Sequence, residues 1–127
     1  MVVKPTYWKG ARKMDADTLS KDDFIVIQNQ SYIKKIKLKD IMYIQRQGRK
    51  LKVVAEDTTY FYYERMENFY DLPEPPFYFP LKGLCINLEN ILSMENQKII
   101  FENGEYVYIG RDGFIRSKQM FHRYLMR

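Results

Sequence analysis

The sequence predicts a mainly β fold, in which antiparallel strands form small packed sheets together with short helices and a C-terminal helix. Tyr and Phe occur 11 and 8 times in 127 residues, and aromatic side chains favour strands. From about residue 24 onward, short segments of alternating apolar and polar residues follow one another with turn residues between them. From residue 111 to the end, the apolar spacing is that of a helix.

Turn residues mark the ends of the expected strands. Residues 29–31 and 56–58 are polar, and Asn103-Gly104 is typical of a tight hairpin. Residues 45–50 contain one glycine and three cations, so we expect an exposed hairpin loop there. The strands and extended runs are expected over residues 24–28, 32–38, 41–44, 51–55, 59–63, 77–79, 84–88, 91–94, 98–101 and 106–109.

Two helices are expected, near residues 64–71 and 112–126. In the first, Met66, Phe69 and Tyr70 share one face by their spacing, and the prolines that follow end the helix. In the second, the charged face carries arginines at 116, 123 and 127. The apolar face of this helix consists of Phe114, Phe121, Tyr124 and Leu125.

The charges are distributed unevenly. Residues 32–52 carry 8 basic groups against Asp40 alone, a balance of +7, and residues 111–127 carry 5 against Asp112 alone, a balance of +4. Residues 53–110 carry 3 basic and 10 acidic groups, a balance of −7. If the fold brings the two basic segments together, they form one positive face for a polyanion. The alternative is ordinary solvated charge on strands and helices.

Residues for catalysis or metal binding are scarce. His122 is the only histidine, and Cys85 lies in an apolar run where a structural cysteine is the expected role. The sequence has no glycine-rich phosphate loop and no paired spacing of Cys or His for zinc. We therefore expect no enzyme, no metal, no cofactor and no small-molecule substrate. Asn87 is expected to satisfy backbone groups in a turn.

The sequence favours a cytoplasmic location. No apolar run approaches the roughly 20 residues that a membrane helix needs, and the N-terminus lacks the apolar core of a secretory signal. A single cysteine fits a reducing compartment. Residues 1–23 are expected to be an arm or linker, and residues 24–127 one domain.

The order of features from Phe24 to Leu125, about four fifths of the chain, resembles a LytTR DNA-binding domain. That family runs through a strand, an Ile-x-Tyr-Ile-like motif, a basic loop, a hairpin and a short helix. An aromatic segment with a basic residue and a Val-Asn pair follows, and then a hairpin and a basic C-terminal segment. The corresponding segments here are 38–45, 78–87, 91–94, 98–109 and Arg111.

The resemblance implies a transcription regulator whose loops, rather than a recognition helix, enter successive major grooves of duplex DNA. The groove-entering positions correspond to Arg49, Lys82 and Arg111, and these side chains suit guanine O6 and N7. The resemblance also implies repeated half-sites and a possible homodimer. The cations that we expect on one DNA-binding side of the fold are Arg46, Arg49, Lys50, Lys82, Arg111 and Arg116.

The chain departs from the usual pattern of the family. Gln45 replaces a common Glu, and Gly110 replaces a Ser. Phe79, Leu81 and Gly83 stand where Arg, His and Ser are common. These three replacements favour an alternative function, a protein-interaction module of the same fold that has lost DNA contacts and modulates another regulator. A third possibility is single-strand or RNA binding on exposed tyrosines.

The cations also have ordinary structural interpretations. Arg49 and Lys50 suit any solvated hairpin loop, and Lys82 suits the edge of a core from which its charged end reaches water. Arg111 suits a cap on nearby carbonyl groups or an ion pair with Asp112. The aromatic strand 59–63 is expected to serve the core more than base stacking.

Overall fold

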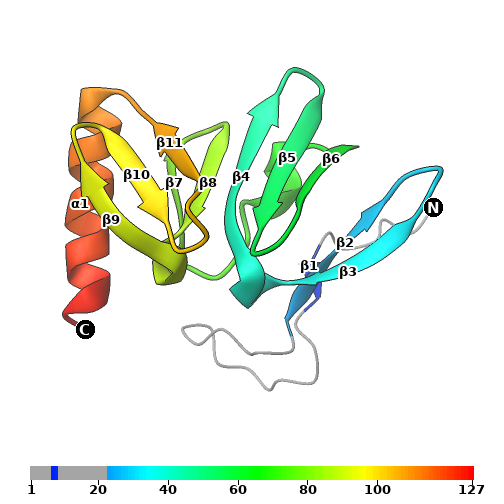
Figure 1. Cartoon of the computed structure of the whole chain (residues 1–127), viewed down its shortest axis with the longest axis horizontal. Coiled ribbons are helices and arrows are strands. Elements are labelled where there is room, and N and C mark those ends of the chain that lie inside the picture. The colour runs from blue at the N-terminus through cyan, green and yellow to red at the C-terminus, as the bar shows by residue number, and fades with distance from the viewer. Residues whose placement is uncertain (1–6, 9–22) are drawn as a thin grey trace.

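The computed structural model describes residues 7–8 and 23–127 (Figure 1). This part of the chain is mostly β-structure with a C-terminal helix, as the sequence predicts. Three antiparallel sheets contain the strands, whose order is β1-β2-β3, β6-β5-β4-β8-β7 and β11-β10-β9. The strands are β1 (Tyr7–Trp8), β2 (Phe24–Gln28), β3 (Ile33–Lys37), β4 (Ile41–Gln47), β5 (Lys50–Ala55), β6 (Thr59–Tyr63), β7 (Phe77–Leu81), β8 (Leu84–Asn87), β9 (Ile91–Glu95), β10 (Lys98–Phe101) and β11 (Tyr106–Tyr108).

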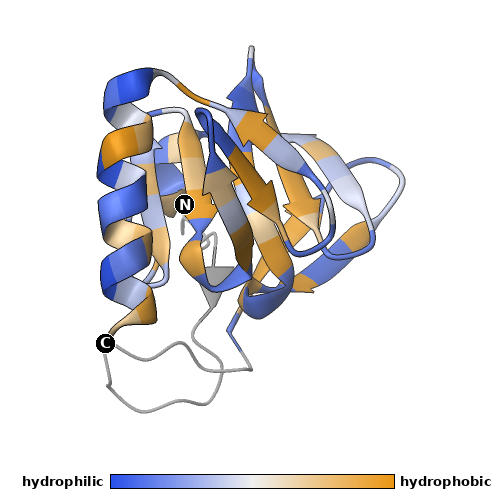
Figure 2. Ribbon diagram, turned by 60° about the vertical axis from the view of Figure 1, so that its left-hand side comes forward, coloured by the Kyte–Doolittle hydropathy of each residue, from blue (hydrophilic) through white to orange (hydrophobic). Residues whose placement is uncertain are grey.

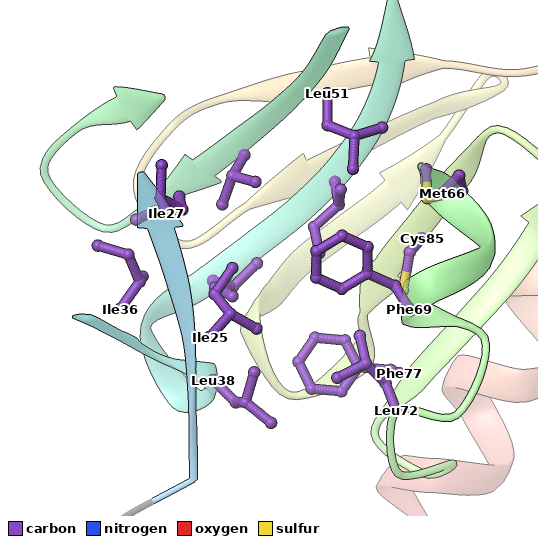
Figure 3. Close-up of a cluster of buried hydrophobic side chains, with 14 of the residues drawn as sticks. Ile25, Ile27, Ile36, Leu38, Leu51, Met66, Phe69, Leu72, Phe77 and Cys85 are labelled. Carbon is purple, nitrogen blue, oxygen red and sulfur yellow. The ribbon is translucent and has the colours of Figure 1, made fainter. Parts of the chain in front are cut away.

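The five-stranded sheet is the middle layer of the domain, because each of its faces packs into a separate hydrophobic cluster. Ile44 and Cys85 point into the cluster shared with the β2–β3 hairpin, which Figure 3 shows. Tyr43 and Ile86 point the opposite way, into the cluster shared with β9, β10 and β11. Successive residues of a strand face opposite sides of the sheet, so burial on both sides explains why these strands are apolar throughout.

The first predicted helix is shorter and tighter than expected. The segment forms a 3-10 helix, η2 (Met66–Phe69), instead of a helix over residues 64–71. Met66 and Phe69 are buried as predicted, but Tyr70 is 48% exposed. The i, i+3 spacing of the two buried residues fits a 3-10 helix as well as an α-helix, and the chain turns away after one turn.

The C-terminal helix α1 (Arg111–Leu125) lies along one side of the domain, with its hydrophilic residues outward (Figure 2). Its fully buried positions are the small residues Gly113 and Ser117, and it packs against β7. Leu125 was expected on the apolar face, but it is 60% exposed because the helix ends there. The partly buried apolar side chains of the helix are Phe114, Met120, Phe121 and Tyr124.

Two asparagines join the start of β4 to the segment after β8. The side-chain amide of Asn87 is buried and donates to the Ile41 carbonyl at 2.8 Å, while its oxygen accepts from the Glu89 amide at 3.0 Å. Asn90 donates to the carbonyl oxygens of Lys39 and Ile41. The predicted structural role of Asn87 is therefore confirmed.

The expected N-terminal arm lies largely outside the described residues. Of the segment 1–23, the structure describes the two-residue strand β1, which pairs with β2, and Asp23. Across the described residues, none of the helices combines the length and the apolar character that crossing a membrane requires.

Candidate nucleic-acid interface

Three connections that are far apart in sequence meet at one end of the domain. These are the β4–β5 turn, the β7–β8 turn and the start of α1, all at the top of Figure 1. We call this end, with the six predicted cations that it carries, the basic end. The local sequence accounts for the shape of each connection.

The β4–β5 connection is a tight turn rather than a long loop. The strands run as far as the pair Gln47 and Lys50, so the predicted loop 45–50 reduces to Gly48 and Arg49. Gly48 has φ +64°, a conformation that glycine adopts without strain, at the first central position where a type II′ hairpin turn places it. Arg49 is exposed at the tip. The ammonium group of Lys50 lies 5.2 Å from the centre of the Tyr63 ring.

The β7–β8 turn, Lys82–Gly83, is fixed by hydrogen bonds from two other elements. The Arg46 amide of β4 donates to the Gly83 carbonyl at 2.8 Å. The Tyr70 hydroxyl, just after η2, donates to the Lys82 carbonyl at 3.1 Å. The exposed Lys82 side chain therefore projects from a backbone whose position is set in advance, which lowers the ordering cost of a contact.

Arg116 joins α1 to the same turn. Its Nη2 donates to the Pro80 carbonyl of β7 at 3.2 Å. Pro80 has no N–H, and it is tolerated because β7 is an edge strand of its sheet. The basic C-terminal segment thus contacts the turn that carries Lys82.

Arg111 is the first residue of α1 and is exposed at the same end. Gly110 precedes it as the N-cap and has no side chain to cap the helix. The free amides of the first helical turn give this end of α1 a partial positive charge, which adds to the charge of the arginine.

The structure therefore brings Arg46, Lys82 and Arg116 together around one turn. Arg49 and Lys50 belong to the β4–β5 turn and Arg111 begins α1, which are the other two connections at this end. All six cations are exposed. Within residues 23–127 the ion pair is that of Arg65 with Glu67, and none of the six cations forms an ion pair with a carboxylate of this range.

Half of the basic segment 32–52 lies elsewhere. Lys34, Lys35, Lys37 and Lys39 belong to β3 and the 3-10 helix η1 (Leu38–Asp40). The ammonium of Lys35 lies 5.2 Å from the Phe24 ring, within the β2–β3 hairpin. Only part of the +7 segment therefore belongs to the basic end, because η1 separates the lysines of β3 from Arg46 in β4.

The opposite end of the domain carries charges of both signs, because Lys35, Lys37 and Lys39 line one pocket together with Asp40, Glu56 and Asp57. Its connections are held together by the Asn103 amide, which donates to the Ala55 carbonyl at 3.1 Å, and by the Glu102 amide, which donates to the Asn90 carbonyl at 2.9 Å. The carboxylates at this end are Asp40, Glu56, Asp57, Glu89, Glu102 and Glu105.

The sequence does not predict that two further residues, Tyr70 and Leu81, belong to the basic end. Its pattern predicts that Tyr70 packs in the core and that Leu81 replaces a residue that contacts DNA. The contact between Tyr70 and Lys82 spans 12 positions and depends on how η2 packs, so no local pattern indicates it.

The titratable groups offer little catalytic chemistry. Cys85 is completely buried, and this burial raises the pKa of its thiol, so the reactive thiolate is disfavoured. His122 is exposed on α1. Among the described residues, no three His, Cys, Asp or Glu side chains are grouped closely enough to hold a metal ion.

Comparisons with known proteins agree with this geometry. Residues 31–122 match the family model of the LytTr DNA-binding domain. The fold is similar to a LytTr DNA-binding domain from a methyl-accepting/DNA response regulator of Bacillus cereus, with a TM-score of 0.64 and 17% identity over 78% of this chain and 95% of that chain. At this identity the likeness to the solved structure shows the fold alone. No curated protein matches the sequence.

Proposed function

Because the chain belongs to the LytTR family of DNA-binding domains, we propose that it is a transcription regulator that binds duplex DNA sequence-specifically through the basic end. The observation that carries the proposal is the convergence of Arg46, Lys82 and Arg116 on the β7–β8 turn. Solvated surface charge alone does not require cations from three distant segments to share one fixed turn.

The six cations divide into two roles in this proposal. Arg49, Lys82 and Arg111 occupy exposed turn positions and enter major grooves, where Arg and Lys donate to guanine O6 and N7. Arg46, Lys50 and Arg116 lie beside them and contact phosphates, which fixes the position of the domain without reading sequence.

The same proposal includes the biological setting. The domain acts on repeated half-sites as a homodimer, in the cytoplasm, where duplex DNA is present, and it carries out no catalysis. Sedimentation velocity of the free protein and of its complex with a two-half-site duplex tests the stoichiometry.

Of the three replacements that favour a protein-interaction module, packing explains one. Phe79 is partly buried and packs edge-to-face on Tyr70 with ring centres 5.0 Å apart, so it serves the core. Gly83 has room for a side chain, because a Cβ there would lie 3.6 Å from Arg46 Cβ, so packing does not account for the absence of a Ser. Only Leu81 is an exposed apolar departure.

The deciding experiment compares fluorescence anisotropy of labelled random duplex, a duplex selected from a random library, single-stranded DNA and RNA at several salt concentrations. The proposal predicts tightest binding to the selected duplex and a steep salt dependence. Equal affinity for selected and random duplex would contradict sequence-specific binding. Preference for single strands or RNA would favour stacking on exposed tyrosines such as Tyr63, Tyr106 and Tyr108.

A further inference from the structure

An exposed leucine lies in the middle of the basic end. Leu81 is the last residue of β7 and pairs with Leu84 across the Lys82–Gly83 turn. The two leucines differ in burial, since Leu81 is 49% exposed and Leu84 is 2% exposed. Leu81 is the more exposed of the two because β7 is an edge strand of the sheet, whereas β8 lies between β4 and β7.

Leu81 lies next to α1. A Cβ on Gly113 would lie 3.8 Å from Leu81 Cδ2 and 3.8 Å from Arg116 Nη2. The two side-chain atoms are therefore at most twice that distance apart. The next residue in the chain, Lys82, has its carbonyl held by Tyr70. The leucine is thus an exposed apolar group with two cations, Lys82 and Arg116, as neighbours.

DNA offers few partners for such a group. Phosphates and most base edges are polar, and the apolar group that the major groove presents is the C5-methyl of thymine. We propose that Leu81 contacts a thymine methyl next to the base pair that Lys82 contacts, and so sets the base preference at that position. This inference rests on the proposed function, and it identifies a residue that determines sequence specificity.

Replacing thymine with deoxyuracil tests the contact directly, because it removes only the methyl group. The duplex is the preferred site obtained by selection from a random library, with each thymine replaced singly. We expect one replacement to weaken binding of the wild type about fourfold, which is the effect of burying one methyl-sized group. The same replacement is expected to change the affinity of the Leu81→Ala variant less than twofold.

Two further variants complete the design. Leu81→Met keeps an apolar side chain of similar volume, and it should retain most of the sensitivity to the thymine methyl even if Leu81→Ala folds poorly. Leu92→Ala removes a leucine of β9 that is 58% exposed, outside the turns of the basic end, and it should behave like the wild type. Thermal unfolding of each variant verifies that it is folded.

The outcomes separate the two proposals. If no duplex is preferred over random sequence, specific binding is wrong and the assignment of Leu81 falls with it. If a preferred duplex exists but no thymine position couples to residue 81, the thymine contact is wrong and DNA binding stands. Equal losses from deoxyuracil in the wild type and in Leu81→Ala would also overturn it.

Discussion

Arg116 and Pro80 are joined by a hydrogen bond from the guanidinium Nη2 to the carbonyl oxygen at 3.2 Å, although 36 residues separate them in sequence. This bond links α1 to the edge of the middle sheet at the point where the Lys82 turn begins. It leaves the other guanidinium donors of Arg116 available for a ligand.

The first prediction concerns Arg116. Arg116→Ala should weaken binding to selected and random duplexes alike and lower the salt slope by about one unit, because it removes one phosphate contact. Arg123→Ala, an exposed arginine two helical turns further along α1, is the matched control and should change neither quantity. Anisotropy titrations over a range of salt measure both. A loss confined to the selected duplex would instead make Arg116 a base-contacting residue.

The second prediction separates base contacts from phosphate contacts. Arg49→Ala or Arg111→Ala should cost about 1–3 kcal/mol on the selected duplex and relax the preference at one base pair. Lys50→Ala should weaken binding to all duplexes to the same extent. Competition between selected and scrambled duplexes measures the difference. If all three variants lose the same factor in affinity for the selected and the scrambled duplex, the proposed contact with bases is wrong. The protein then reads DNA shape or binds without specificity.

The third prediction tests whether Tyr70 positions Lys82. Tyr70→Phe removes the hydroxyl that donates to the Lys82 carbonyl, and we expect a loss of about 0.5–1.5 kcal/mol in DNA affinity. If Tyr70 acts through Lys82, this loss disappears in the Lys82→Ala background, which a double-mutant cycle measures. Tyr106→Phe, at a half-exposed tyrosine of β11, serves as the control. Additive losses would mean that Tyr70 contacts DNA itself.

These contacts show where prediction from sequence succeeds. Strands such as β5 and the Asn103-Gly104 hairpin were predictable because alternation and turn residues are local signals. The C-terminal helix was predictable for the same reason, since its apolar spacing persists over four turns. In η2 the apolar pattern covers only one helical turn, which does not distinguish a 3-10 helix from an α-helix.

The arrangement of the basic end depended on long-range packing. The sequence indicates that Arg46, Lys82 and Arg116 are basic and lie near turns. Their meeting requires the pairing of β4 with β8 and the packing of α1 on β7, which no local pattern contains. The same limit explains why Leu125 is exposed. The helical apolar spacing includes this residue, but spacing does not show whether another element covers it.

The fourth prediction concerns Tyr62, whose side chain is 4% exposed. Its buried hydroxyl has no hydrogen-bond partner among the described residues. Burial raises the pKa of this hydroxyl well above its ordinary value, and the charge of Glu64 adds to the effect. The folded state therefore holds the proton more tightly than the unfolded chain, so ionisation of Tyr62 does not affect the free energy of unfolding below pH 10 and lowers it as the pH rises above 10.

Tyr62→Phe should leave the free energy of unfolding at pH 7 unchanged or raise it by up to about 1 kcal/mol, since it removes an unsatisfied buried group. It should also reduce the loss of stability above pH 10. Urea denaturation between pH 7 and 11 measures both effects, with Tyr63→Phe, whose side chain is 73% exposed, as the control. A large destabilisation at pH 7 would show that the hydroxyl has a partner after all.

The last prediction concerns the N-cap of α1. Gly110 has φ −61° and ψ 161°, which suit a capping serine, and a Cβ at this position would meet nothing within 4 Å. Gly110→Ser should stabilise the protein by about 0.5–1 kcal/mol, because the hydroxyl caps a free amide and the unfolded chain loses freedom. Gly104→Ser is the contrasting control, since its φ of +89° is strained for any side chain, and it should destabilise the protein. Thermal unfolding measures both. If Gly110→Ser is neutral, the amides of the first turn are already satisfied in the free protein, and the start of α1 contributes less positive potential to the basic end than we infer.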